Sequence, residues 1–401
     1  MPAAVQTSQP MRQMQGIAVP AESVNPELFF ERTRRHISPE TNRTYGGGGT
    51  TQIVELRKAD ILSTITLRFV GTITVTGGTT NSTAAWPLGI AGVRFTANGQ
   101  SNLINTGQAS ASGGGLEHLR ARDYMKKSDL TDRGVVQSIG GVQRSHGTLS
   151  LASESWGVGS SATGIAAGTY SVDLTFAIPV AEDERDLVGA IFLQTSSSDL
   201  TLAIDETPLG QLFTGGTATS VTLAGQWQVS TTKFSIPIGP DGQIVVPNLN
   251  VFHSIIASRV SNGVGNGENE HRLVGQGAGK SLLRVFGRVI NGTGTAAAPL
   301  AMTSANFGPL AYRFGNNETP DTFFDGSAMR ADLERRYNTD LGGVRGYFCH
   351  DFAHENTFRD VLDMGTAAEL RLVTTVQNSV SLAAPALEYV TETAFLAGSA
   401  A

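Results

Sequence analysis

The chain has 401 residues, of which 40% are hydrophobic and 16% charged, and its formal net charge is −6 at pH 7. This length suffices for about two or three domains with cores of their own. Its 47 glycines, beside many Ser, Thr, Val and Ala residues, favour short β-strands joined by small-residue turns. The excess of acidic side chains argues against nucleic-acid binding as the main task, because neutralising phosphates needs an excess of Lys and Arg.

Cysteine content and hydropathy indicate the cellular compartment that suits the chain. The chain has a single cysteine, Cys349, so no intrachain disulfide can form, and stability has to come from burial and from association with other chains. No stretch approaches the roughly 18 apolar residues that span a bilayer, and residues 1–7 lack the charged and apolar regions of a signal peptide. We therefore expect a protein of a reducing cytoplasm that neither crosses a membrane nor follows the secretory route.

The first expected element is an N-terminal arm with a short helix. Residues 1–22 are polar, rich in Gln, Met, Ala and Pro, and show no periodicity that would bury a face. A capping asparagine and the first-position Pro26 predict a helix from Pro26 to about His36, which a Ser-Pro pair ends. Four glycines at 46–49 follow as a linker, so residues 1–48 are predicted to form the arm.

From Thr51 onward the sequence changes to β-branched runs, and several of its segments recur in the same order in the second half. The ordered matches are 67–73 (LRFVGTI) with 283–289 (LRVFGRV), 93–98 with 312–317, the Arg-rich helical segments 116–127 with 328–337, and the late strand starts 199–202 with 369–372. Such ordered self-similarity indicates a duplicated structural unit.

The duplication predicts the fold class. Each copy offers about eight short strands with one helix in a loop, which suits two packed antiparallel sheets better than βαβ units. We predict an all-β protein of two consecutive eight-stranded jelly-roll β-sandwiches with short helices in loops and an N-terminal helical arm. The first roll is assigned to 49–238 and the second to 239–401.

Turn and loop signals set the finer boundaries. The turn at 238–242 separates the last strand of the first copy, 228–238, from a strand that starts at 244–246. Segments 134–168 and 258–279, rich in small residues, are predicted to be inserted surface loops.

One glycine-rich segment invites comparison with a phosphate-binding loop. Residues 275–281 (GQGAGKS) contain the glycines and the lysine of such a loop. However, the first required glycine is replaced by Val274, and the following segment is predicted to be a strand instead of a helix. A loop that enters a strand is the preferred interpretation.

Two further clusters could carry chemistry. His350 and His354 lie four residues apart near Cys349, a spacing that can share one metal on a helix. Because the segment follows a strand, the imidazoles need not converge, and solvated turn residues are the preferred interpretation. The acidic run 182–186 is interpreted as a turn between strands instead of a pair of catalytic carboxylates. We therefore expect no catalytic residues, no cofactor and no metal.

The basic residues Arg32, Arg34 and Arg35 lie near the end of the predicted N-terminal helix. Two interpretations stay open. They can be a solvated helix end that the helix dipole favours, or they can contact phospholipid head groups or nucleic acid from a flexible arm.

The order of these features resembles the major capsid proteins of tectivirus-type tailless phages, in the double jelly-roll lineage that includes adenovirus hexon. Residues 175–181 (TFAIPVA) and 186–191 (DLVGAI) resemble the strand, Pro-containing turn and Asp-Leu-x-Gly-Ala strand of the first roll. Residues 335–341 (RRYNTDL) and 347–349 (YFC) are similar to the helix-to-strand passage of the second roll. The resemblance covers nearly the whole chain and departs mainly in the loops.

The resemblance implies a structural subunit instead of an enzyme. Each chain supplies two sandwiches, so a homotrimer imitates a hexamer and tiles an icosahedral phage shell. The implied location is the virion capsid, assembled in the host bacterial cytoplasm. The implied partners are neighbouring capsomers and penton and minor capsid proteins, with no specific nucleic acid. Residues 1–48 then contact the lattice, with Arg32, Arg34 and Arg35 as contact residues toward a neighbour or an internal lipid membrane.

Two other functions stay open: a receptor- or carbohydrate-binding β-sandwich protein of a virion spike, and a two-sandwich carbohydrate-active enzyme. The enzyme is disfavoured because carbohydrate clefts present aromatic platforms and a converging acid pair, whereas aromatic residues make up only 7% of this chain. Stoichiometry separates the spike from the capsid subunit, since a spike is a minor virion protein.

Overall fold

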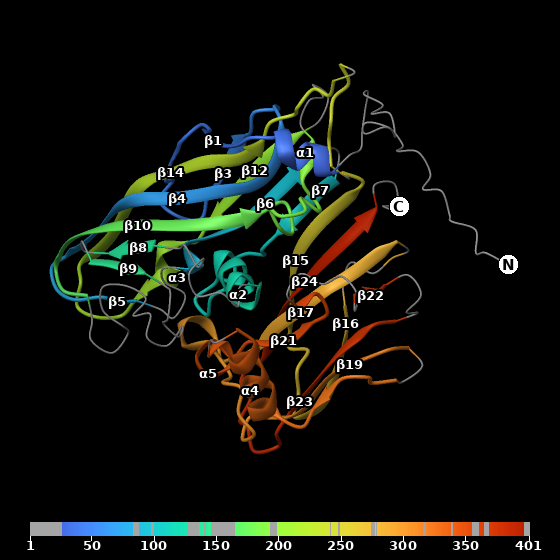
Figure 1. The fold of residues 1–401 in the computed structure, drawn as a ribbon. Helices are drawn as coiled ribbons and strands as arrows, with labels where there is room; N and C mark the ends of the chain where they lie inside the picture. The colour runs from blue at the N-terminus through green and yellow to red at the C-terminus, as the bar shows by residue number, and fades with distance from the viewer. Residues whose placement is uncertain are drawn as a thin grey trace.

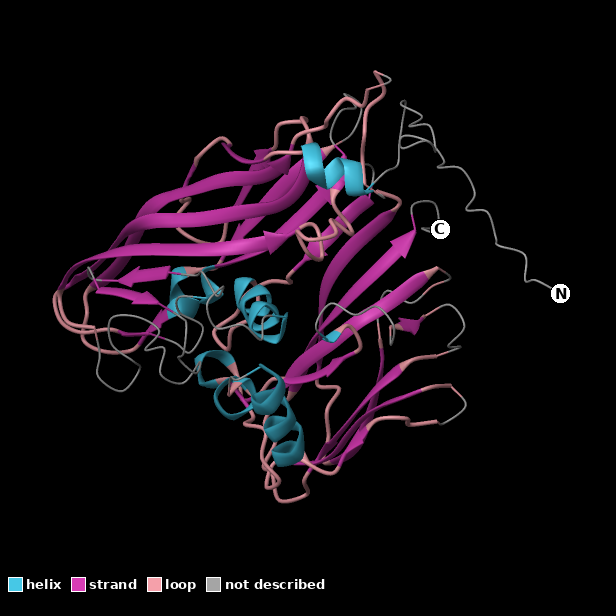
Figure 2. Ribbon diagram, in the orientation of Figure 1, coloured by secondary structure: helices cyan, strands magenta, loops and turns pink. Residues whose placement is uncertain are grey.

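The computed structural model shows two β-sandwiches in tandem, one from each half of the chain (Figures 1 and 2). It describes residues 26–82, 88–97, 100–126, 136–139, 142–145, 165–192, 199–240, 242–247, 249–273, 277, 279–315, 318–337, 340–354, 361–364 and 369–396. Helices lie in the loops, and strands dominate both halves. The predicted all-β fold of two consecutive jelly rolls is confirmed.

The first roll consists of two facing sheets. One has the order β1-β14-β4-β10 and the other the order β7-β6-β12-β3. In chain order their bounds are β1 (Arg35–Pro39), β3 (Thr51–Glu55), β4 (Ile61–Thr76), β6 (Ala91–Ala97), β7 (Gln100–Asn105), β10 (Gly168–Pro179), β12 (Leu200–Glu206) and β14 (Ser220–Phe234). Apolar and polar residues alternate along β4, because one face of the strand packs into the core and the other faces outward.

The second roll repeats this arrangement strand for strand, with the orders β15-β24-β17-β21 and β16-β23-β19-β20. The bounds are β15 (Val251–Ser261), β16 (Gly267–Arg272), β17 (Lys280–Asn291), β19 (Phe307–Arg313), β20 (Thr322–Phe323), β21 (Phe348–Asp351), β23 (Arg371–Val376) and β24 (Ala386–Leu396). Helix α2 (Leu116–Lys126) follows β7, and α4 (Gly326–Tyr337) follows β20. The predicted duplication is therefore present in three dimensions.

Shorter elements complete the description. They are α1 (Pro26–Arg32), β2 (Arg43–Thr44), β5 (Asn81–Ser82), η2 (Leu88–Ile90), β8 (Val136–Ile139), β9 (Val142–Ser145), β11 (Ile191–Phe192), α3 (Leu209–Leu212), β13 (Phe213–Thr214), η4 (Gly294–Ala296), β18 (Ala298–Pro299), α5 (Leu341–Arg345) and β22 (Leu362–Asp363).

A glycine occupies the same place in the matched strands β4 and β17. A Cβ on Gly71 would collide with the carbonyl oxygen of Ala224, and a Cβ on Gly287 with that of Glu388. Each glycine thus lets its strand approach the neighbouring strand closely, which explains why both matched segments contain one.

The two rolls are joined by continuous backbone pairing. Strand β7 of the first roll pairs in parallel with β15 of the second, where Ile104 lies opposite Ile255. Both side chains are buried in one apolar core that extends through both rolls. The contact between the rolls is therefore part of the fold of each chain.

The N-terminal helix is shorter than predicted. Helix α1 ends at Arg32, and Arg35 and His36 lie in β1 instead. Strand β1 pairs with β14, where Arg35 lies opposite Phe234; this pairing between distant parts of the chain overrides the local helix signals. As a result, β1, which lies within the segment 1–48, is the edge strand of one sheet of the first roll. Residues 1–25 lie outside the described residues.

Three local predictions need correction. Residues 244–246 do not form the predicted strand; Pro247 lacks the amide that a central strand needs, and Val245 and Val246 instead lie in the small core that contains Phe29 of α1. Segment 258–279 contains the end of β15 and all of β16, so it contributes a strand to each sheet of the second roll instead of forming only a surface loop. Within segment 134–168, the described residues include the hairpin β8–β9, which pairs with β10.

Candidate functional site

Helix α2 lies where the two rolls meet (Figure 1). Its sequence, LEHLRARDYMK, places charged residues on every face, yet the residues from Leu116 to Met125 are buried apart from the half-buried Asp123. A helix of this composition stays buried only if its charges find partners. The second roll provides them.

The first group of partners surrounds Glu117 at the start of α2. Arg288 of β17 donates to Glu117 Oε1 at 2.9 Å and Arg345 of α5 donates to the same oxygen at 2.5 Å. Arg288 also donates to Glu388 of β24 at 3.0 Å, and its guanidinium lies 4.9 Å from the ring centroid of Tyr347. Burial alone would raise the pKa of Glu117, but Arg288 and Arg345 outweigh it and hold the pKa well below its usual range.

The second group surrounds Glu392 of β24. Arg122 of α2 donates to it at 2.5 Å, Arg284 of β17 at 2.5 Å, and the Nε2 atom of His253 lies 2.7 Å away. Glu182, which follows β10, lies 3.6 Å from Arg284. Burial opposes ionisation of Glu392, but Arg122 and Arg284 hold its pKa well below the usual range. This carboxylate therefore remains charged in the interior.

We call these side chains the inter-roll network: Glu117, Arg122 and Glu182 from the first roll, and His253, Arg284, Arg288, Arg345, Asp351, Glu388 and Glu392 from the second. Each has a side chain no more than 7% exposed. Desolvation offsets much of the attraction in such pairs, so the network adds little net stability, but an unmatched member costs a great deal. Its effect is to fix how one roll docks on the other.

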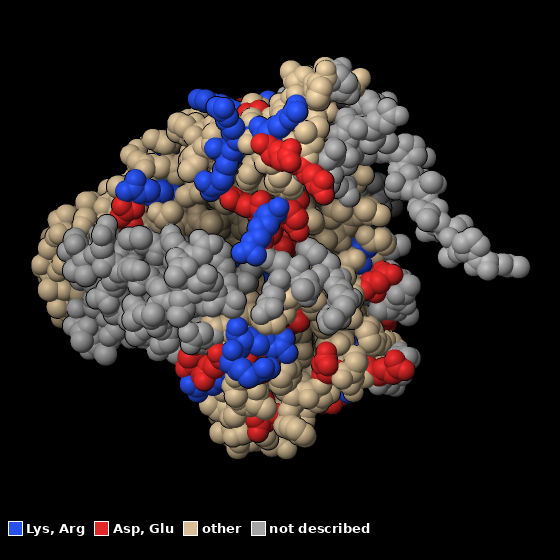
Figure 3. All heavy atoms as spheres, viewed as in Figure 1, with Lys and Arg blue, Asp and Glu red and all other residues tan. Residues whose placement is uncertain are grey.

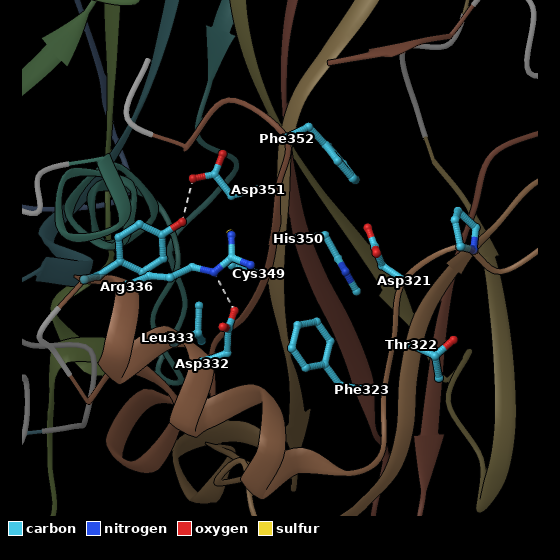
Figure 4. Close-up of a pocket in the computed structure, with 12 residues that line it drawn as sticks. Asp321, Thr322, Phe323, Asp332, Leu333, Arg336, Cys349, His350, Asp351 and Phe352 are labelled. Atoms are coloured by element: carbon cyan, nitrogen blue, oxygen red, sulfur yellow. Dashed lines mark hydrogen bonds and ion pairs between the residues drawn. The ribbon is translucent and has the colours of Figure 1, made fainter. Parts of the chain in front are cut away.

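A cavity of about 340 Å³ lies in the second roll between α4, β20 and β21. Figure 4 shows His350 beside Phe323. Arg336 is paired with Asp332 at 2.7 Å, and Tyr337 donates to Asp351 at 2.5 Å. Burial lowers the pKa of His350 to about 4. The cavity therefore combines a neutral imidazole with charges that are already matched.

The histidine pair does not form one site. His350 packs edge-on against Tyr312, with ring centroids 5.5 Å apart, whereas His354 packs against Tyr337 at 5.6 Å. Across the described residues, no group of three or more His, Cys, Asp or Glu side chains is placed to hold a metal ion. In the glycine-rich segment, residues 275, 276 and 278 lie outside the described residues, and the chain continues as the strand β17, as predicted.

The three predicted contact residues lie in different elements. Arg32 is in the last turn of α1, Arg34 is in the link to β1, and Arg35 is in β1. All three are exposed. Arg35 donates to Glu184 at 2.9 Å, so it is held against the turn 182–186. Within the described residues, no helix is long and apolar enough to cross a membrane.

The inter-roll network was not among the predicted sites. A usable signal was present, since Arg284 and Arg288 interrupt the otherwise apolar strand 282–290, and a buried strand tolerates arginine only opposite acidic partners. The partners themselves could not be named from this signal.

Solved structures of virus capsid proteins are similar to this fold. The major capsid protein of STIV is 14% identical, with a TM-score of 0.62 over 90% of this chain and 97% of that one. The atomic structure of Sulfolobus Turreted Icosahedral Virus gives 14% identity and a TM-score of 0.60, over 90% of this chain and 91% of that one. The PBCV-1 virus capsid gives 11% identity and a TM-score of 0.53, over 92% of this chain and 95% of that one.

At these identities the likeness establishes the fold, which is a double jelly roll of the kind found in these capsid proteins. No protein-family model matches the chain, and no curated protein matches its sequence.

Proposed function

We propose that the chain is the major capsid protein of a tailless icosahedral phage and that three copies form a pseudo-hexameric capsomer. The observation that carries this proposal is the strand-for-strand duplication within one chain. Two matched sandwiches per chain become six in a closed ring of three chains, which is the number a hexagonal tile needs. The likeness to virus capsid structures supports the same role.

The oligomeric state tests the proposal directly. Three chains of 42.1 kDa each amount to about 126 kDa, and we expect this mass by light scattering on the purified protein. A stable, well-folded monomer contradicts the capsomer. In purified virions the chain should be the dominant protein at about 42 kDa, whereas a minor band at that mass favours a spike.

The proposed role is structural and not enzymatic. It places the chain in the virion capsid, after assembly in the host bacterial cytoplasm, with neighbouring capsomers and penton and minor capsid proteins as partners. It is supported by the inter-roll network, in which charged groups that are almost fully buried are engaged with one another.

We further propose that Arg32, Arg34 and Arg35 contact a neighbouring capsomer or an internal lipid membrane. Their exposure beside α1 supports this assignment. We expect Arg32→Glu combined with Arg34→Glu to leave trimers intact and to impair shell assembly. Flotation with anionic vesicles separates the two partners, since only lipid contact predicts that the native protein floats and the variant does not. Normal shells from the variant contradict the assignment.

A further inference from the structure

The outward face of β14, β4 and β10 in the first roll is exposed, whereas the matching face of the second roll is buried. Its residues are mostly small and polar and are exposed or half-buried: Thr66, Arg68, Val70, Thr72 and Thr74 on β4, Ser171, Asp173 and Thr175 on β10, and Thr222, Ala224, Gln226, Gln228 and Ser230 on β14. We call this surface the open face. On the matching surface of the second roll, β24 and β17 are covered by α2, whose Arg122 and Glu117 pair with Glu392 and Arg288.

The two faces correspond residue by residue. Arg284 on β17 lies opposite Glu392 on β24, and Arg68 lies opposite Gln228 on β14. Each arginine bonds its partner in the opposite strand and also an aspartate of the next strand, Asp351 or Asp173. The difference is burial, since the side chain of Arg284 is 1% exposed and that of Arg68 is 47% exposed. The open face is thus the uncovered counterpart of a buried interface.

The complementary surface is exposed as well. Helix α4 occupies in the second roll the place that α2 occupies in the first, and Figure 3 shows Lys and Arg side chains gathered over it. Unlike α2, α4 exposes Ser327, Ala331, Glu334 and Arg335. Phe324, in the loop that precedes α4, is 88% exposed, which is costly for a large aromatic side chain in water.

We infer that the open face of one copy covers α4 and Phe324 of a second copy, as β17 and β24 cover α2 within one chain. The inference rests on the proposed trimer and names its contact surfaces. The two surfaces differ, so the contact is head to tail. Three such contacts close a ring in which each contact between the two rolls of one chain alternates with a contact between rolls of neighbouring chains. Phe324 and the Arg68–Asp173 pair then become buried at every subunit boundary.

Cross-linking tests the pairing of these surfaces. Thr72 occupies on β4 the place of Arg288 on β17, and Ser327 is the second residue of α4 as Glu117 is of α2. In one chain Arg288 touches Glu117, so Thr72 and Ser327 should be close between two chains. We expect Thr72→Cys with Ser327→Cys, treated with a bis-maleimide, to give covalent dimers and trimers on a denaturing gel.

The single variants serve as controls. Each alone should give no cross-link, because the contact is head to tail and the remaining Cys349 is buried. A mixture of the two single variants should give dimers and no trimers. Cross-links from a single variant indicate a symmetric contact and overturn the inference.

Light scattering separates the failure of this inference from that of the proposed function. If the protein is a 126 kDa trimer (three chains of 42.1 kDa) but its double-cysteine variant gives no cross-link, the inferred contact surfaces are wrong and the proposed capsomer is not contradicted. A monomer overturns both.

We also expect Phe324→Glu to shift the protein from trimer to monomer while its circular dichroism stays unchanged. Ile238→Glu, at another exposed apolar residue, should remain trimeric, and a trimeric Phe324→Glu variant contradicts the inference.

Discussion

The arginines Arg68 and Arg284 show how one residue type serves two environments. Both donate to an aspartate and to a second acceptor across the sheet. At the exposed site water screens the pair, so it adds at most about 1 kcal/mol. At the buried site the same arrangement is a requirement, because removing one charge leaves the others without compensation.

The first prediction compares arginines at buried and exposed sites. Arg284→Gln leaves Glu392, Glu182 and Asp351 with one cation fewer in the interior, and we expect a loss of about 3–5 kcal/mol in the free energy of unfolding. Arg94→Gln removes an exposed partner of Asp205 and should cost about 1 kcal/mol or less. Denaturant titration measures the free energy of unfolding of both variants. Equal losses would show that burial does not determine how much an arginine contributes to stability.

The second prediction concerns acid stability. Burial lowers the pKa of His118 and of His350 to about 4, whereas a histidine in the unfolded chain titrates near about 6.5. Between these values the unfolded chain binds more protons than the folded one, so the free energy of unfolding falls as the pH falls. The expected slope is about 1.4 kcal/mol per pH unit for each histidine, and burial shifts the pKa of His271 in the same direction.

Urea titrations between pH 7 and pH 5 measure this slope. The double variant His118→Gln with His350→Gln should lose stability less steeply on acidification than the native protein. An unchanged slope contradicts the assignment of the acid sensitivity to these two residues.

At the scale of elements, long core strands and loop helices were predictable, and edge strands were not. Strands β4 and β17 carry extended β-branched or apolar runs, and α2 and α4 follow strands at matching places. By contrast, β16 has the polar sequence GENEHR and β1 contains a proline. These two are strands because a neighbour pairs with them, and no local pattern reports a pairing partner that is distant in sequence.

The inter-roll network escaped prediction for a related reason. Glu117 and Arg288 are 171 residues apart in the chain, Glu117 and Arg345 are 228 apart, and Arg122 and Glu392 are 270 apart. A sequence shows that Arg288 needs an acidic partner, but only the pairing of β17 with β24 selects Glu388, and only the docking of the rolls selects Glu117, among the 35 Asp and Glu residues.

The third prediction concerns α1. Phe29 is fully buried in a small core with Ile61, Leu187 and Phe234, whereas the adjacent Phe30 is 38% exposed. Phe29→Ala should destabilise the first roll by about 3–5 kcal/mol through the cavity that it leaves. Phe30→Ala is the matched control and should cost well under half as much. Thermal unfolding of the two variants checks this, and similar melting temperatures would show that α1 is not anchored through Phe29.

At the scale of the whole molecule, the two rolls form one cooperative unit. The β7–β15 pairing continues a sheet from one roll into the other, and the apolar core is shared. The inter-roll network adds charges that neither roll can satisfy alone. Each roll depends on the other, because Glu117 of the first roll is paired with Arg288 and Arg345 of the second roll, and Arg122 of the first roll with Glu392 of the second.

The last prediction follows from this dependence. A fragment of residues 239–401 expressed alone exposes the apolar side of β15 and leaves Arg288 without Glu117, so we expect an insoluble or unfolded product by circular dichroism. Co-expression with residues 1–238 should restore a folded complex in which the two fragments co-purify, and this complex also controls for the chain break in the turn at 238–242. The break itself should be tolerated because Ile238 is exposed and forms only an isolated bridge, with Ile244, outside the named strands. If the second roll folds alone with a cooperative transition, the network and the shared sheet are dispensable for folding, and the duplication then consists of two independent domains that associate after folding.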